Sequence, residues 1–165
     1  MNLRIANKND WQRILDIYNQ ATVTGFCNAD IEPVSIQSRR DWFLEHSPTE
    51  YPIYVVEKTD NLIGWCSLSP YRKGRNALKT VAEISFFLDN HFKGQGVGTW
   101  LIQNVIREAR NLGFNNLIAI LLDKNEASIR LLKNHGFEKW GHLPEIAYFN
   151  DTICGQFIYG LKINR

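Results

Sequence analysis

Apolar residues recur along this chain with two different periods, and each change of period marks a boundary between elements. Near the start, Trp11, Ile14, Leu15 and Tyr18 share the spacing of one helical face. This predicts a helix that Asp10 caps at its N-terminus. The same spacing, together with the prolines and glycines that interrupt it, predicts three further helices. The four predicted helices span Trp11 to Gln20, Ser38 to His46, Val97 to Leu112 and Asn125 to Asn134.

Between these helices lie short segments rich in β-branched and aromatic residues, which predict strands. One of them, Leu117 to Leu122, is apolar throughout, as expected of a strand that is buried on both faces. The order of strands and helices predicts the α/β class, with one sheet and helices on both of its faces. The predicted strands span Leu3 to Ile5, Ile53 to Glu57, Leu62 to Leu68, Val81 to Leu88, Leu117 to Leu122, Phe137 to His142 and Gln156 to Leu161.

The composition fits one packed domain over residues 1–165, with 44% hydrophobic and 22% charged residues. A net charge of +2 excludes the strongly basic footprint of a dedicated nucleic-acid binder. The longest apolar run, Leu117 to Leu122, is too short to cross a membrane. The first eight residues contain no secretory signal, and three widely spaced cysteines favour free thiols. We therefore expect a cytoplasmic protein without a nucleic-acid or membrane partner.

The sequence also lacks the patterns of two common kinds of active site. Its four histidines have no metal-ligand spacing with one another or with cysteine, so no metal site is predicted. No Gly-x-Ser-x-Gly segment occurs in the sequence, which argues against a serine hydrolase.

The most informative segment is the glycine-dense turn from Lys93 to Gly98, between a predicted strand and a predicted helix. Glycines let the backbone approach a ligand closely. The following helix adds unpaired amides and the positive end of its dipole, so the segment suits an anion such as phosphate. The Rossmann pattern needs glycine at position 99 and the P-loop pattern needs lysine there, but Thr99 is present. The alternative interpretation is a glycine-rich turn that binds no ligand.

This turn is one of several stretches whose order resembles that of a known family. Together they resemble the GNAT family of N-acetyltransferases, and within it the phosphinothricin and methionine sulfoximine acetyltransferase-like branch. The family's acetyl-CoA loop reads Arg/Gln-x-x-Gly-x-Gly/Ala, and here Lys93 replaces the usual Arg or Gln, followed by Gly96 and Gly98. The resemblance covers nearly the whole chain. The other stretches are Ile17 to Asn19, Arg40 to Phe43, Tyr51 to Val55, Ala82 to Leu88, Asn125 to Ile129 and His135 to Phe137.

The resemblance implies a mixed, mostly antiparallel central sheet and acetyl-CoA as the co-substrate. In this fold, one strand offers backbone groups to the pantetheine arm, the glycine-rich loop wraps the pyrophosphate, and two asparagines lie near the cofactor. It leaves open whether the chain forms a homodimer, as members of the family often do. The implied cofactor-binding residues are Phe86, Phe87, Leu88, Lys93, Gly94, Gln95, Gly96, Val97, Gly98, Thr99, Asn125 and Asn134.

The resemblance also implies that Glu83 is the general base. Acetyl transfer needs a neutral amine, whereas an alkylammonium is mostly protonated at pH 7, and a carboxylate can remove the proton directly or through water. Strand alternation puts Glu83 and Ser85 on one face of the strand, and Ile84 and Phe86 on the other. The alternative interpretation of Glu83 is a buried structural carboxylate or an edge charge.

A basic loop precedes the strand that carries Glu83. Relatives that acetylate amino-acid-like compounds have an Arg after an aromatic residue in this loop, and Tyr71 and Arg72 match that pair. An Arg offers a planar fork for a carboxylate. The implied acceptor-binding residues are Arg72, Lys73, Gly74 and Ser85. A solvated basic loop is the alternative, and Lys73, Arg75 or Lys79 could replace Arg72 in a shifted alignment.

Two departures from the family pattern concern the acid and the acceptor pocket. Leu132 stands where many relatives have the Tyr or His that protonates the leaving thiolate, and Tyr148 and Tyr159 are candidates only by elimination. The segment 147–154 lacks a Trp that many relatives have there. The sequence predicts acetylation of a small amino-acid-like amine, which excludes neither a polyamine, aminoglycoside or protein amine as acceptor nor a non-catalytic acyl-CoA sensor.

Overall fold

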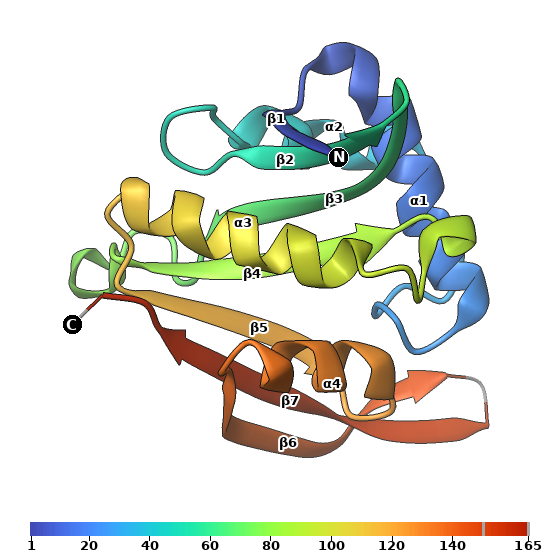
Figure 1. The fold of residues 1–165 in the computed structure, drawn as a ribbon. Coiled ribbons are helices and arrows are strands. Elements are labelled where there is room, and N and C mark those ends of the chain that lie inside the picture. The colour runs from blue at the N-terminus through green and yellow to red at the C-terminus, as the bar shows by residue number, and fades with distance from the viewer. Residues whose placement is uncertain (150, 165) are drawn as a thin grey trace.

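The fold is built around one sheet of seven strands, with the order β1-β2-β3-β4-β5-β7-β6. The computed structural model describes residues 1–149 and 151–164. Neighbouring strands are antiparallel except for β4 and β5, which are parallel (Figure 1). The strands are β1 (Asn2–Ile5), β2 (Ile53–Lys58), β3 (Asn61–Pro70), β4 (Val81–Leu88), β5 (Asn116–Leu122), β6 (Glu138–Phe149) and β7 (Thr152–Lys162).

Four α-helices cover the two faces of the sheet. Ile14 and Ile17 of α1, with Phe43 of α2, pack on Val55 and Trp65 of the sheet. The opposite face packs against α3 and α4 in a second and larger apolar core (Figure 1). The helices are α1 (Trp11–Thr24), α2 (Ile36–Glu45), α3 (Val97–Asn111) and α4 (Glu126–Asn134), with short 3-10 turns at η1 (Lys8–Asp10), η2 (Asn76–Leu78) and η3 (Asn90–Phe92).

The strands β4 and β5 separate half-way along their length (Figure 1). They pair only from Val81 with Asn116 to Glu83 with Ile118. Beyond that point β4 keeps its β3 partner as far as Leu88, and β5 keeps its β7 partner as far as Leu122. One edge of β4 therefore presents backbone groups to the gap between the strands, where a ligand can bond to them.

The structure confirms the predicted α/β class, the mostly antiparallel sheet and the helices on both faces. It extends the last two predicted strands into a long hairpin of β6 and β7. Local pattern missed this extension because β6 is an edge strand that is exposed on both faces over much of its length, so its polar and apolar residues do not alternate.

Asp10 is the N-cap residue of α1, as predicted, but its side chain makes no capping hydrogen bond to that helix. Its carboxylate accepts hydrogen bonds from Asn7 N at 2.7 Å and from Arg4 Nη1 at 2.7 Å, so it belongs to η1 and to an ion pair with β1. Arg4 of β1 thus binds the carboxylate that would otherwise cap the helix.

Among the described residues, no helix is both long and apolar enough to cross a membrane.

Candidate active site

A groove of about 400 Å³ lies beside the free edge of β4. It brings together most of the predicted cofactor-binding residues, from three separate segments of the chain. Of the others, Val97 is buried in the core, Gln95 donates a hydrogen bond to His91 O, and Asn134 is exposed at the end of α4. The groove is lined by Ala21, Cys27, Phe86, Phe87, Leu88, Lys93, Gly94, Gly96, Gly98, Thr99, Asn125, Ala127, Ser128 and Leu131.

The glycines of the turn shape one wall of this groove. Gly94 and Gly96 have φ values of +73° and +79°, a conformation that side chains other than glycine rarely adopt. Gly96 is the N-cap of α3. A Cβ on Gly98 would lie 3.0 Å from a methyl carbon of Leu131. The first-turn amides of α3 therefore face a narrow, side-chain-free approach, which suits a phosphate.

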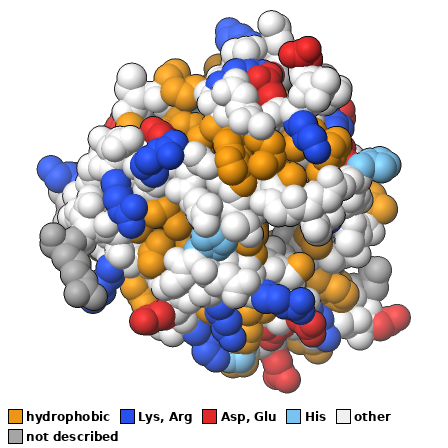
Figure 2. Space-filling model, in the orientation of Figure 1, with side chains coloured by type: hydrophobic (Ala, Val, Ile, Leu, Met, Phe, Trp, Pro, Cys, Tyr) orange, Lys and Arg blue, Asp and Glu red, His pale blue; other side chains and the backbone are white. Residues whose placement is uncertain are grey.

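The face of the protein that carries α3 and α4 shows Lys and Arg side chains at several separate places (Figure 2). No single dense basic patch gathers on the part of this face that the figure shows. Lys93 is the basic side chain among the residues that line the groove. Anion binding there would therefore depend on backbone amides together with one lysine.

Asp89 fixes the point at which β4 ends and the turn begins. It is 3% exposed. Its Oδ2 accepts from Arg13 Nη2 at 2.5 Å and Gln20 Nε2 at 3.2 Å, and its Oδ1 accepts from His91 N at 2.9 Å. Burial opposes ionisation, but these hydrogen bonds outweigh it and lower the pKa of Asp89. Gln20 Oε1 also accepts from Asn90 N, so α1 holds both residues that lead into the loop.

A second cavity of about 220 Å³ lies on the other face of β4, under α1 and α2. Phe87 and Cys27 line both this cavity and the groove, so the two spaces adjoin at these residues. The walls are strongly aromatic, with Trp65 and Tyr18 each 4.9 Å from the Phe87 ring centroid. The cavity is lined by Ile14, Leu15, Tyr18, Cys27, Asn28, Ala29, Arg39, Trp42, Phe43, Trp65, Ser85, Phe87, Ile120, Leu121, Leu122 and Gln156.

Glu83 lies on the same face of β4 as this cavity. The neighbours Ala82 and Ile84 belong to the core under α3, whereas Phe87 packs towards α1 and α2. The predicted alternation of Glu83 and Ser85 against Ile84 is therefore confirmed. Ser85 lines the cavity and Glu83 does not. Burial raises the pKa of the half-buried Glu83 carboxyl.

Arg72, Lys73 and Gly74 lie on the exposed turn between β3 and η2, and none of them lines either cavity. Lys73 Nζ lies 3.2 Å from Glu45 Oε1 in a surface ion pair. The structure thus does not bring these three residues together with Ser85. Their role in binding the acceptor stays a prediction.

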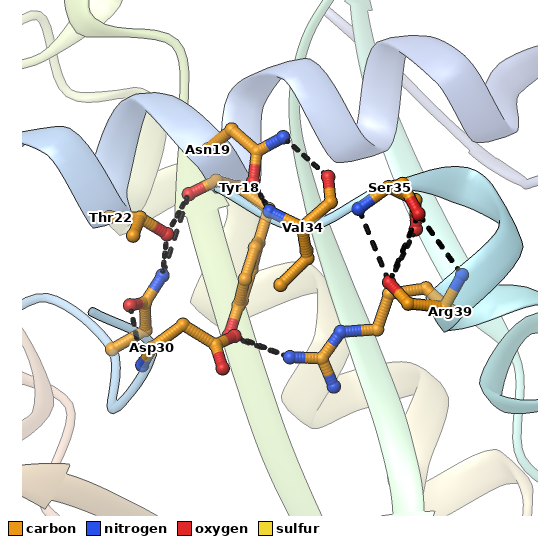
Figure 3. Close-up of polar contacts among 9 residues, drawn as sticks. Tyr18, Asn19, Thr22, Asp30, Val34, Ser35 and Arg39 are labelled. Carbon is orange, nitrogen blue, oxygen red and sulfur yellow. Dashed lines mark hydrogen bonds and ion pairs between the residues drawn. The ribbon is translucent and has the colours of Figure 1, made fainter. Parts of the chain in front are cut away.

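The aromatic cavity contains polar residues that the sequence analysis did not assign to a site. Arg39 lines it from α2 and pairs with Asp30 of the segment 25–35, while Tyr18 lines it from α1 (Figure 3). The sequence held one signal, because Arg39 shares a helical face with Trp42 and Phe43. Residues on one helical face contact the same surroundings, and here Arg39, Trp42 and Phe43 all line the cavity.

Leu132 and the two tyrosines named as possible acids line neither cavity. Leu132 is fully buried in the core beneath α4. Tyr159 is also buried in this core, and Tyr148 is exposed on β6.

Comparison with known proteins assigns the chain to a family. The sequence model of the acetyltransferase (GNAT) family matches residues 11–137. The chain is a member of the GNAT family. GNAT membership makes it an acetyl-CoA-dependent N-acetyltransferase, and the relatives below support the phosphinothricin acetyltransferase-like branch.

Three similar proteins illustrate the relationship. YwnH of Bacillus subtilis, whose name refers to phosphinothricin acetyltransferase, is 37% identical over 165 residues, covering 99% of this chain and all of YwnH. The L-methionine sulfoximine/L-methionine sulfone acetyltransferase of Pseudomonas aeruginosa is 31% identical, covering 87% of this chain and 84% of that protein. The structure of yncA from Salmonella typhimurium with its cofactor acetyl-CoA matches with a TM-score of 0.91 at 25% identity, covering 100% and 95% of the two chains.

Within residues 1–149 and 151–164, no group of three or more His, Cys, Asp or Glu side chains could hold a metal ion.

Proposed function

We propose that this GNAT protein transfers the acetyl group of acetyl-CoA to the primary amine of a small amino-acid-like acceptor, through one domain over residues 1–165. The observation that carries the proposal is the junction of the two cavities at Phe87 and Cys27. A thioester in the groove and an amine in the aromatic cavity would meet there, beside the unpaired edge of β4. The relative that acts on methionine sulfoximine supports an amino-acid-like acceptor.

The groove is the proposed acetyl-CoA site. The pyrophosphate would lie on the amides at the start of α3 and beside Lys93, where the helix dipole and the charge favour an anion. The pantetheine arm would bond to the free backbone groups of Phe86 to Leu88, as a further strand would. Asn125 caps α4 by accepting from Ser128 N at 3.2 Å, which fixes the opposite wall.

Glu83 is the proposed general base. It lies two residues from Ser85 on one face of β4, which is a separation of about 7 Å along a strand. Since Glu83 does not line the cavity itself, its carboxylate would take the ammonium proton through water. Burial raises the pKa of Glu83 towards the range in which a base works efficiently at neutral pH.

The proposed transfer is direct and needs no cysteine nucleophile. The neutral amine attacks the thioester carbonyl, the C–N bond forms, and the C–S bond breaks. The electron pair leaves on the CoA sulfur, and the proton that the nitrogen loses as the amide forms passes through water to the thiolate. Backbone N–H groups of β4 would polarise the carbonyl oxygen as charge develops on it.

The test is a thiol-release assay with acetyl-CoA and a panel of free amino acids, methionine sulfoximine, phosphinothricin, polyamines and short peptides. We expect turnover with acceptors that carry both an α-amine and a carboxylate. Turnover with polyamines alone would contradict the proposed acceptor class but would still support acetyl transfer to an amine. Tight acetyl-CoA binding with no turnover on any member of the panel would contradict the catalytic proposal and favour a sensor.

Two further parts of the proposal concern the protein in the cell. Cys27, Cys66 and Cys154 are free thiols, which supports a reducing compartment such as the cytoplasm. The exposed apolar residues Trp140, Leu143, Ile146, Tyr148 and Ile153 lie on β6 and β7, and a homodimer would bury such a surface. Light scattering over a range of concentrations tests the second part, and a constant mass of about 19 kDa would contradict it.

A further inference from the structure

Three side chains form a polar cluster at the mouth of the aromatic cavity. The Tyr18 hydroxyl donates a hydrogen bond of 2.5 Å to Asp30 Oδ2, and Arg39 Nη2 pairs with the same oxygen (Figure 3). The Arg39 guanidinium also lies over the Tyr18 ring, 5.4 Å from its centroid. The cluster holds the guanidinium in one position, although a third of the Arg39 side chain is exposed.

The Arg39 guanidinium has N–H donors that make no hydrogen bond to the described residues. Within the described residues, Arg39 makes its side-chain hydrogen bonds through Nη2 alone, with Asp30 and with the Tyr18 hydroxyl. The N–H groups of Nε and Nη1 have no protein partner among those residues. Nη1 alone carries two N–H donors, so a carboxylate can accept from Nη1 while Asp30 keeps Nη2.

Arg39 is also the one charged side chain among the described residues that line this cavity. The rest of the lining is aromatic, aliphatic or neutral polar. A charged group that enters such a low-dielectric space needs an opposite charge there. The cavity is thus suited to an acceptor that carries one anionic group together with an apolar body.

We propose that Arg39 binds the carboxylate of the acceptor and so determines the specificity for amino acids over simple amines. This inference rests on the proposed function. The carboxylate accepts from Nη1, and Asp30 keeps Nη2 and the orientation of the guanidinium. The acceptor side chain packs against Trp42 and Trp65, and the amine points towards Phe87 and the thioester.

A purely structural role of Arg39 predicts a different behaviour. In that case the ion pair only ties the segment 25–35 to α2, as Asn19 ties it to α1 through two hydrogen bonds with Val34. Its loss would then lower the stability and the turnover of every acceptor alike. A comparison of two acceptors that differ only in the carboxylate separates the two roles.

The experiment measures kcat and KM for L-methionine and for L-methioninamide, with the intact protein and saturating acetyl-CoA. The variants are Arg39→Gln, which removes the charge, and Arg39→Lys, which keeps a positive charge beside Asp30 but has one nitrogen to share between Asp30 and the acceptor. Arg40→Gln is the matched control, because Arg40 is the exposed neighbour on the same helix and lines neither cavity.

We expect Arg39→Gln to lower the ratio of kcat/KM for the acid over the amide by about tenfold to a hundredfold, mainly through KM for the acid. Arg39→Lys should fall between wild type and Arg39→Gln, and Arg40→Gln should match wild type. The KM for acetyl-CoA should stay constant throughout. Because the same two acceptors serve every variant, the difference in their amine basicity cancels.

Four outcomes would overturn the assignment. An equal loss on acid and amide would leave Arg39 a structural role only. A loss of acid preference in Arg72→Gln but not in Arg39→Gln would move the carboxylate site to the turn after β3. A wild-type protein that prefers the amide would contradict the carboxylate site and leave the transferase activity in place. No turnover on either acceptor would contradict the carboxylate site for methionine, and the proposed function fails as well only if no member of the acceptor panel is turned over.

Discussion

Arg13 Nη2 lies 2.5 Å from Oδ2 of Asp89, so the first helix holds the end of the strand from which the cofactor loop departs. The contact joins residues 76 positions apart in the sequence. Arg13 also donates to Leu62 O at 3.0 Å, which fastens the same helix to β3. The start of the glycine turn is therefore fixed by α1 as well as by the local bond from His91 N to Asp89.

This relationship predicts the behaviour of Asp89→Asn. The change removes a buried charge partner of Arg13 and should lower the free energy of unfolding by about 2 kcal/mol, which corresponds to a fall in Tm of about 4 to 8 °C. The KM for acetyl-CoA should rise as well, because the turn loses its anchor. Asp16→Asn is the control, since Asp16 is an exposed residue of α1. Equal Tm values for the two variants would contradict this role.

The same carboxylate predicts a dependence of stability on pH. The pKa of Asp89 is lower in the folded protein than its ordinary value of 3.8, so the folded state binds fewer protons than the unfolded state. Its contribution is complete above about pH 4 and is lost as the pH falls towards the folded pKa. The Tm difference between wild type and Asp89→Asn should therefore shrink below about pH 4. A difference that is constant between pH 7 and pH 3 would refute this argument.

Glu83→Gln tests the general base by its pH profile. Removal of a general base costs about a hundredfold to ten-thousandfold in rate, and the loss should be greatest near pH 7, where the amine is protonated. At high pH the amine is already neutral, so the two rates should approach each other. Because burial raises the folded pKa of Glu83, the ionised carboxylate opposes folding at pH 7, and the variant should have a higher Tm there. Glu138→Gln, on exposed β6, is the control. Parallel pH profiles would remove Glu83 from the mechanism.

The sequence predicted those parts of the site that a local pattern defines. The strand Val81–Leu88 and the helix that follows the glycine turn have the predicted starts, because β-branched runs and glycines act over a few residues. Alternation along β4 also placed Glu83 and Ser85 on one face. These features depend on the period of the chain and on no distant contact.

The aromatic cavity could not be predicted in the same way. Tyr18, Arg39, Phe87 and Gln156 come from four elements, and only the packing of α1 and α2 on the sheet brings them together. Arg72 was predicted from its position in the sequence. Whether a residue of that loop lines the cavity depends on how the loop is placed in three dimensions, and Arg72 does not line it. Asp10 shows the same limit, because Arg4 takes the carboxylate that a local pattern assigns to a cap.

Gly96 and Gly113 offer a matched pair at the two ends of α3. Both have positive φ, +79° and +85°, with no atom within 4 Å of an added Cβ. Substitution by alanine should therefore cost each a similar strain of about 1 kcal/mol. Gly96→Ala should in addition raise the KM for acetyl-CoA by about tenfold, because it alters the backbone that lines the groove, whereas Gly113→Ala should not. Equal KM values for the two variants would show that the turn does not contact the coenzyme.

Cys27 provides a chemical probe of the junction between the cavities. It is half-buried and lines both spaces, whereas Cys66 and Cys154 are buried and burial raises the pKa of each thiol. Iodoacetamide should therefore label Cys27 first, since exposure and thiolate formation govern reactivity. Acetyl-CoA at ten times its Kd leaves about one eleventh of the protein unoccupied, so it should slow the labelling by about elevenfold. Peptide mass spectrometry identifies the site, and Cys27→Ser should abolish the fast phase. Labelling of Cys27 at the same rate with and without acetyl-CoA would mean that the coenzyme does not reach the junction on which the proposed transfer depends.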